Sequence, residues 1–324
     1  MSATGGGMVS LLGLDPAGYG RHSLHATDRV YPETNCYTDI LIELVHARGE
    51  EPLAMMACAL EVDFEGDQWT FFKPRPEDLE RLYGIDIHEM QPYRPLPDQI
   101  AEQIEAGRTL VVELDSWYLP DTAATSYRRE HVKSSVVAES IDREGERLRY
   151  FHGPGYFELA GEDYRGVFRL GRPLADDVLP PYTELARFDA GPHLDGEELR
   201  AVARELLGRA VAARPASNPF ERFGAQLGRD LPRLLAGDAA AYHDYAFATV
   251  RMVGSAFEAG AAQVGWLLGA EGEAAVAAMG RIVEGSKALS FKLARRREFD
   301  PGPALAELAA AWEQSFSELG DALL

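Results

Sequence analysis

The chain has 324 residues, 46% hydrophobic and 26% charged, which is the composition of a globular protein with one large domain or two ordinary ones. Its formal net charge of −20 disfavours nucleic acid and anionic membranes as partners, because both require a basic surface. Two cysteines make no disulfide framework, and we expect neither a transmembrane span nor a signal peptide, so a cytoplasmic location is predicted.

The first part of the chain, residues 1–190, mixes apolar alternation with glycine, proline and aromatic residues. Apolar residues at helical spacing predict helices over 36–48, 76–83 and 96–106. Strands are predicted over 108–120 and 131–142, and two further strands joined by a Gly-Pro-Gly turn over 147–161. Helices followed by an antiparallel meander indicate an α+β domain.

The second part, residues 191–324, is rich in Ala, Leu, Glu and Arg and has helical apolar spacing throughout. It predicts an all-helical domain of four to six helices, with Asp195 as N-cap and Glu198 completing a capping box. Breaks between these helices are predicted near 214–219, 236–239, 269–272 and 299–303.

Common catalytic and cofactor motifs are not found in the sequence. The eight histidines form no HExxH motif, the cysteines have no zinc-type spacing, and the glycines fit neither a phosphate loop nor a dinucleotide fingerprint. There is no G-x-S-x-G nucleophile elbow either. The chemistry that remains is that of a thiol and an imidazole.

Cys36 opens the helix predicted over 36–48. The free N–H groups and positive dipole end of a helix N-terminus favour a thiolate, and the same N–H groups can bind a developing oxyanion. The alternative is that Cys36 is a small buried residue. The other cysteine, Cys58, lies in the apolar run AMMACAL and is predicted to belong to the core.

A cysteine nucleophile needs a base, and a base needs a group that orients it. His131, at the start of a predicted strand, is the candidate base, and Asp115 and His152, on the neighbouring strands, are candidates for the orienting group. Each has a structural alternative, since His131 can be a surface residue and Asp115 can cap its strand or bond to the turn that follows.

Five blocks of the chain, in order, resemble the bacterial family DUF1839. They are ETNCYTDILIELVHARGEEP, DFEGDQWTFFKPRPEDLERLYGI, VELDSWYLPDT, YRREHVKSS and YFHGPGYFELAGEDY. That family in turn resembles, more distantly, butirosin biosynthesis protein H and the papain-like C39 peptidases. The resemblance implies a papain-like domain with Cys36 as nucleophile and His131 as base, followed by a helical lid or docking domain.

The chain departs from the papain pattern at two places. Papain-like proteases carry a glutamine before the cysteine for the oxyanion hole, and here Asn35, a backbone amide or Gln68 would have to replace it. The usual Asp or Asn after the base histidine has no clear match, so that Asp115 and His152 both remain candidates for the third member of the triad.

The function implied by the resemblance is acyl transfer from a carrier-protein thioester through Cys36 to an amine, in specialised biosynthesis. No cofactor is expected apart from the phosphopantetheine arm of the carrier, and no metal. Carrier proteins are typically acidic, so the basic clusters of this acidic chain are candidate docking residues, although they can equally be solvated faces. These are Arg128, Arg129, Lys133, Arg295, Arg296 and Arg297. A cysteine hydrolase and a non-catalytic binding scaffold are the alternatives.

Overall fold

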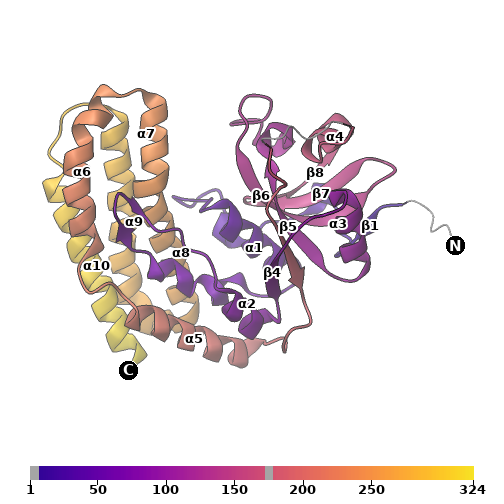
Figure 1. Cartoon of the computed structure of the whole chain (residues 1–324). Coiled ribbons are helices and arrows are strands. Elements are labelled where there is room, and N and C mark those ends of the chain that lie inside the picture. Colours follow the sequence, from indigo (N-terminus) through magenta and orange to yellow (C-terminus); the bar gives the residue numbers. More distant parts are fainter. Residues whose placement is uncertain (1–6, 172–177) are drawn as a thin grey trace. The chain divides into compact units, whose positions relative to one another are not determined.

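The computed structural model describes residues 7–171 and 178–324, and it divides the chain into two compact units (Figure 1). The first unit comprises Met1–Ser23, Cys36–Pro52 and Leu79–His193, and the second comprises Leu24–Asn35, Leu53–Asp78 and Leu194–Leu324. Two segments that precede residue 190, Leu24–Asn35 and Leu53–Asp78, therefore fold with the helical C-terminal region rather than with the sheet.

The first unit is built on an antiparallel sheet with strand order β4-β9-β5-β6-β7-β8, to which β1 is added at the end of β6. The strands are β1 (Val9–Ser10), β4 (Asp86–Met90), β5 (Thr109–Asp115), β6 (Lys133–Asp142), β7 (Arg147–His152), β8 (Gly155–Ala160) and β9 (Thr183–Arg187). The strands expected over 108–161 are confirmed, whereas β4 and β9 were not predicted.

Strand β5 ends at Asp115, five residues before the predicted end. The carboxylate of Asp115 accepts a hydrogen bond from the backbone N–H of Trp117 at 3.0 Å, which turns the chain into the 3-10 helix Ser116–Tyr118. A second 3-10 turn, Pro120–Thr122, follows directly. The apolar residues that follow Asp115 therefore belong to a loop and not to strand β5.

Helices cover both faces of this sheet. Helix α1 (Cys36–Ala47) places Ile40 and Leu44 against Val111 and Val137 on one face. On the other face, α3 (Leu96–Glu105) and α4 (Glu162–Val167) pack against the side chains that alternate with those two valines, including Val112 and Val136. The unit is therefore a three-layer α/β/α arrangement with a separate apolar core on each side of the sheet.

The second unit is mainly helical, as predicted for the C-terminal region. Its helices are α5 (Gly196–Ala212), α6 (Pro219–Ala236), α7 (Ala239–Ala246), α8 (Met252–Leu268), α9 (Glu273–Ala294) and α10 (Gly302–Leu323), with a π-helical turn, Phe247–Arg251, between α7 and α8. It also contains the 3-10 helix Pro52–Glu61 and the hairpin of β2 (Phe64–Glu65) and β3 (Gln68–Trp69). Helix α2 (Pro76–Tyr83) runs from the second unit into the first.

The expected capping box at the start of α5 does not form. Asp195 stands at the N-cap, but its side chain makes no capping hydrogen bond. Gly196, the first helical residue, has φ +48°, so the chain enters the helix through a left-handed residue. A side chain at the preceding position is then not directed at the free N–H groups of the first turn.

Aromatic and carboxylate side chains tie the two early segments into the second unit. Trp69 is fully buried and packs on Phe220 at a centroid distance of 4.9 Å. Glu258 on α8 accepts hydrogen bonds from the backbone N–H groups of Val30 and Tyr31 at 2.9 and 2.7 Å. These long-range contacts explain why residues from the first part of the chain join the helices.

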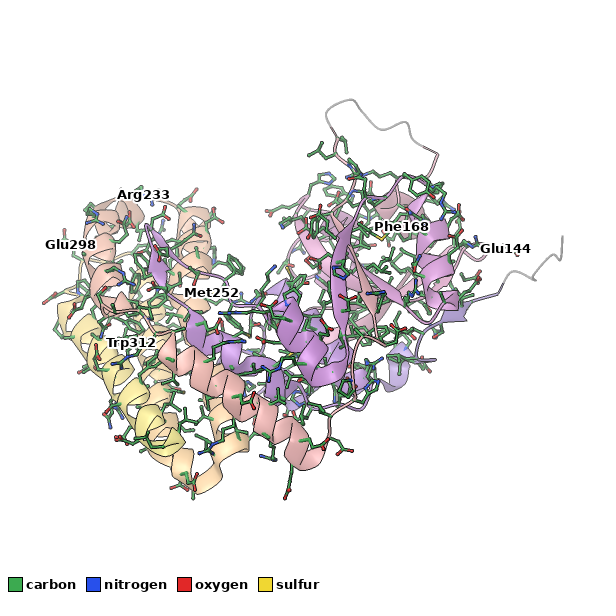
Figure 2. All side chains as sticks on the ribbon, turned by 60° about the horizontal axis from the view of Figure 1, so that its bottom comes forward. Glu144, Phe168, Arg233, Met252, Glu298 and Trp312 are labelled. Atoms are coloured by element: carbon green, nitrogen blue, oxygen red, sulfur yellow. The ribbon has the colours of Figure 1, made fainter. Side chains whose placement is uncertain are left out.

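Within the helical unit, polar and apolar positions separate as helical amphipathicity requires. Met252 and Trp312 lie inside it, whereas Arg233 and Glu298 stand at its surface (Figure 2). None of the helices in the described part of the chain is long and apolar enough to span a membrane.

Candidate functional site

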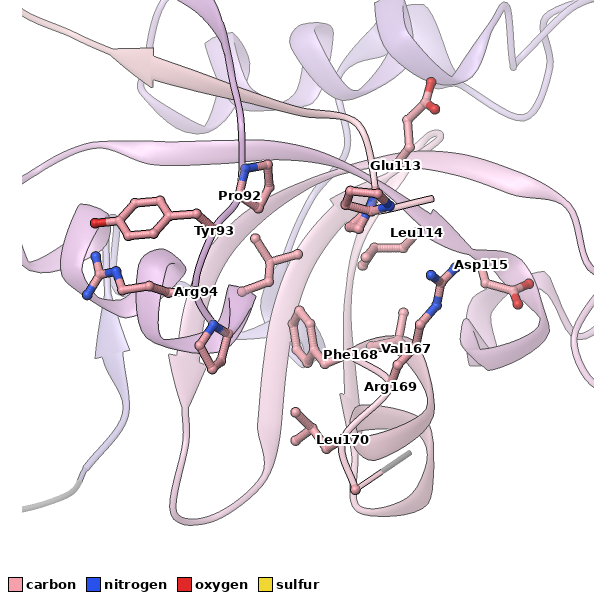
Figure 3. A pocket seen from close by; sticks show the side chains of 15 residues that line it. Pro92, Tyr93, Arg94, Glu113, Leu114, Asp115, Val167, Phe168, Arg169 and Leu170 are labelled. Atoms are coloured by element: carbon pink, nitrogen blue, oxygen red, sulfur yellow. The ribbon is translucent and has the colours of Figure 1, made fainter. Parts of the chain in front are cut away.

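The adjoining ends of β5 and β6 bring several predicted site residues to one edge of the sheet. Asp115 lies directly across from Lys133, and Glu113 directly across from Ser135. Because side chains alternate along a strand, these four residues share the face of Val111, which α1 covers. Figure 3 shows Glu113 and Asp115 turned away from a cavity that lies on the opposite face.

Cys36 is the first residue of α1 and is half-buried. Its thiol donates a hydrogen bond to the hydroxyl oxygen of Ser135 on β6, with 3.6 Å between sulfur and oxygen. The next charged groups along this face are Glu113, opposite Ser135, and Lys133, whose ammonium donates to Glu113 at 2.5 Å. The thiol thus meets a hydroxyl, with an ion pair beyond it.

His131 and Asp115 form the expected imidazole–carboxylate pair. Nδ1 of His131 lies 2.7 Å from Oδ2 of Asp115, and the ring stacks on Trp117 at a centroid distance of 4.6 Å and an interplanar angle of 10°. The imidazole is 65% exposed, and Nε2 has no hydrogen-bond partner among the described residues. A neutral ring that donates Nδ1–H to Asp115 leaves Nε2 as a proton acceptor directed at solvent.

The structure does not bring Cys36 and His131 into contact. Over the described residues no hydrogen bond joins the thiol to the imidazole, since the thiol bonds to Ser135 and the ring to Asp115. Cys36 is the first residue of α1, whereas His131 lies two positions before β6. The two groups therefore belong to different elements of the same unit and do not form a hydrogen-bonded dyad.

His152, the other candidate for orienting the base, is engaged on the opposite face. Its Nε2 lies 2.7 Å from the hydroxyl of Ser134, and its Nδ1 lies 2.5 Å from Oδ2 of Asp121. The other oxygen of Asp121 accepts a hydrogen bond from the hydroxyl of Tyr150. No bond joins His152 to His131 within the residues that the structure describes, so Asp115 is the partner of His131.

The two side chains considered for an oxyanion hole, Asn35 and Gln68, both belong to the second unit. Asn35 is buried, and its amide donates to the carbonyl of Phe72 at 3.0 Å. Gln68 is exposed at the tip of the β2–β3 hairpin. Asn35 directly precedes Cys36 in the chain.

Two of the candidate docking residues are already paired with carboxylates in the first unit. Arg128 donates to Asp163 at 2.6 Å and to Glu162 at 3.3 Å. Lys133 is held by Glu113. Their charges are therefore largely compensated within the chain.

The other basic candidates are more available. Arg129 donates to the carbonyl of Ala124, and Arg296 donates to the carbonyl of Gly237, and both are exposed. Arg295 and Arg297 are exposed as well. In the described part of the chain none of these four forms an ion pair.

Three polar residues of this sheet edge were missed by sequence reasoning: Ser134, Ser135 and Asp121. The signal was the pair Ser134-Ser135 directly before the apolar run 136–138, where alternation sends one hydroxyl to each face. Asp121 lies in the block that contains Asp115, but only the three-dimensional path of the loop shows that it reaches His152.

A cavity of about 540 Å³ opens beside β5, on the face opposite α1. Its wall is mostly apolar and includes Pro92, Leu96, Leu114, Val167, Phe168 and Leu170. Leu114 and Phe168 turn toward it (Figure 3). The cavity suits an apolar group rather than a strongly charged one.

Cys58 is buried in the 3-10 helix Pro52–Glu61, as predicted, and burial raises the pKa of its thiol well above the ordinary range. Of the histidine, cysteine and acidic residues in the described ranges, no three or more come together in a group that could hold a metal ion. Cys36 is the more exposed of the two thiols.

Two family models match the chain. The DUF1839 N-terminal domain matches residues 20–188 and the DUF1839 C-terminal domain matches residues 196–321. No curated protein matches the chain. The first match covers strands β4 to β9 of the sheet together with Cys36, His131 and Asp115, and the second covers α5 to α9 and nearly all of α10. Together they span nearly the whole sequence, and the chain belongs to the DUF1839 family.

Proposed function

We propose that this protein is a cysteine-dependent acyltransferase of the papain-like type, which takes an acyl or aminoacyl group from a carrier-protein thioester and delivers it to an amine. The observation that carries the proposal is the position of Cys36. Its half-exposed thiol stands at the first residue of α1, against Ser135, on the sheet face whose edge carries His131 and Asp115.

In the first step the sulfur of Cys36 attacks the carbonyl carbon of the thioester, and the bond to the phosphopantetheine thiol of the carrier breaks. One thioester replaces another, so the step is nearly isoenergetic and needs positioning more than strong activation. The free N–H groups of the first turn of α1 can stabilise the oxyanion. The proton of the Cys36 thiol passes through solvent to the departing phosphopantetheine thiolate. While Cys36 is a thiolate, the hydroxyl of Ser135 can rotate and donate to the sulfur.

In the second step an amine attacks the acyl-cysteine. Nε2 of His131 accepts the proton of the amine, and Asp115 stabilises the imidazolium that results. The exposure of His131 fits a base that works on a diffusible acceptor rather than on the thiol alone. The carbon–sulfur bond then breaks and releases an amide. The proton held by His131 passes through solvent to the departing sulfur, which regenerates the Cys36 thiol.

Docking of the carrier is assigned to the basic residues that lack carboxylate partners. Arg129, Arg295, Arg296 and Arg297 form no ion pair in the described part of this otherwise acidic chain. Arg128 and Lys133 are poorer candidates because Asp163 and Glu113 neutralise them. Electrostatic docking of this kind weakens as the salt concentration rises.

The test is product analysis with a loaded carrier protein and a panel of primary amines. The proposal predicts an amide that forms with the full chain and is lost in Cys36→Ala, while Cys58→Ala is the matched control and retains the activity. Release of the free acid, with or without amine, would instead establish a cysteine hydrolase. If neither product forms, the chain is a binding scaffold and the proposal is wrong.

A further inference from the structure

A second hydrogen-bonded chain of side chains lies on the sheet face opposite Cys36. The hydroxyl of Ser134 and Nε2 of His152 are 2.7 Å apart, and Nδ1 of His152 and the carboxylate of Asp121 are 2.5 Å apart. Three elements contribute: β6, the end of β7 and the turn Pro120–Thr122. The order hydroxyl, imidazole, carboxylate is that of a nucleophile, its base and the group that orients the base.

The tautomer of the imidazole follows from the carboxylate. An ionised Asp121 can only accept hydrogen bonds, and its two oxygens accept from Tyr150 and from Nδ1–H of His152. Nε2 of His152 is then an acceptor, so the hydroxyl of Ser134 donates its proton to it. Ser134 must lose its hydroxyl proton to act as a nucleophile, and that proton is already directed at Nε2 of His152.

The three hydrogen-bonded side chains differ in how far they are buried. The side chains of His152 and Asp121 are only 11% and 5% exposed, whereas Ser134 is half-buried. The orienting groups are thus shielded from water, which strengthens their interaction, while the hydroxyl retains access from outside. A histidine with a purely structural role does not require a partly exposed hydroxyl as its hydrogen-bond partner.

The cavity described above lies on the same face. Ser134 is directly across from Leu114, and Leu114 lines the cavity (Figure 3). Neighbouring strands are about 4.8 Å apart, so an acyl group seated against Leu114 lies one strand from the hydroxyl. Ser135 and Cys36 are on the other side of the sheet.

We propose that Ser134, His152 and Asp121 form a second nucleophilic centre, independent of Cys36, which cleaves uncharged carboxylic esters with an apolar acyl group. The oxygen of Ser134 bonds to the carbonyl carbon while its proton passes to Nε2 of His152. The carbon–oxygen bond to the alcohol then breaks, and His152 returns the proton to the leaving alcohol.

Water completes the cycle. His152 takes one proton from a water molecule, the resulting hydroxide bonds to the acyl carbon, and the ester bond to Ser134 breaks. The proton held by His152 returns to the oxygen of Ser134, and a carboxylic acid is released. Asp121 is a positioning residue that stabilises the imidazolium in both halves.

The experiment uses the full chain carrying Cys36→Ala, so that its outcome does not depend on thiol chemistry or on the proposed acyl transfer. A fluorophosphonate probe is added, and the modified residue is identified by peptide mass. We expect an adduct on Ser134 that disappears when the chain is first unfolded. The same chain is expected to hydrolyse p-nitrophenyl butyrate, and Ser134→Ala is expected to lower that rate at least a hundredfold.

Two further variants keep the test independent of folding. Ser140→Ala, on the same strand with its hydroxyl bonded to the sulfur of Met8, is the matched control and should retain both the adduct and the hydrolysis. Asp121→Asn leaves Ser134 in place but should lower the rate of ester hydrolysis, measured as a function of pH, because the imidazolium of His152 loses its counter-charge. Absence of an adduct on Ser134 in the folded chain, or labelling of Ser134 and Ser140 alike, would overturn the proposal.

Discussion

The two faces of one sheet carry two different arrangements of nucleophile, imidazole and carboxylate. On the face of α1, Cys36 and the pair His131–Asp115 are accessible but are not joined to one another. On the other face, Ser134, His152 and Asp121 are joined in sequence and largely enclosed. The same strand, β6, supplies residues to both faces.

The difference teaches that connectivity and accessibility are separate requirements of a site. The open face has a proton acceptor, Nε2 of His131, without a fixed donor, which suits a reaction in which the substrate brings the proton. On the enclosed face both nitrogens of His152 already have partners, and its base nitrogen is held by the hydroxyl of Ser134.

The largest effect is expected for the exposed imidazole. His131→Ala should lower kcat/KM for acyl transfer by about 10² to 10⁴-fold, the usual contribution of a general base. The matched control is His88→Ala, because His88 is likewise exposed and paired with a carboxylate, Asp86 at 2.6 Å, but lies on the edge strand β4. Equal losses in the two variants would show that His131 has no special role.

The two carboxylates should differ in their contribution to stability. Asp121→Ala removes a buried acceptor from His152 and Tyr150 and is expected to cost about 2–4 kcal/mol of unfolding free energy. Asp115→Ala breaks a pair whose histidine is exposed and removes the capping bond to the N–H of Trp117, and it should cost about 1 kcal/mol. Urea denaturation of both variants measures the difference, and a reversed order would contradict the assignment of enclosed and open faces.

The two thiols should differ in reactivity by more than about tenfold near neutral pH. Cys36 is half-exposed, whereas burial raises the pKa of Cys58 and keeps it protonated and shielded. Timed labelling with iodoacetamide, read out by peptide mass, gives the two rates. Similar rates in the folded chain would mean that Cys36 is no more available than a core cysteine, and unfolding in denaturant should make the rates equal.

The smallest effect is expected for the hydroxyl beside the thiol. Ser135→Ala removes the group 3.6 Å from the sulfur of Cys36 and should slow acyl transfer roughly threefold to tenfold, the loss of one modest hydrogen bond. Single-turnover kinetics with a loaded carrier would locate the loss in formation of the acyl-enzyme. An effect confined to the transfer step would contradict the role given to Ser135.

Sequence reasoning anticipated much of the local structure. Helical spacing predicted α1, α3 and the C-terminal helices, and alternation predicted β5 to β8. Both periods can be read from the positions of the apolar residues alone. The edge strand β4 and strand β9 were missed, since DIHEM and TELAR are short and each carries two charged residues three positions apart, which interrupts the alternation. Their pairing is decided by the sheet and not by their own sequence.

The sequence predicted the candidate site only in part. The contacts that were missed join residues from different elements of the fold, and no local sequence pattern encodes such contacts. The pair His131–Asp115 follows from two strands that are consecutive in the sheet. The partners of His152 could not be predicted, because Asp121 reaches it from a loop and Ser134 from the neighbouring strand. The assignment of Asn35 to the second unit likewise depends on the contact with Phe72, which no local pattern encodes.

The most direct test of the proposed acyl transfer is the mass of the chain after incubation with a loaded carrier protein and no amine. We expect the mass of the protein to increase by the mass of the acyl group. The added mass should lie on the peptide that contains Cys36 and should disappear when an amine acceptor is added. An unchanged mass, or an adduct that persists in Cys36→Ala, would contradict it.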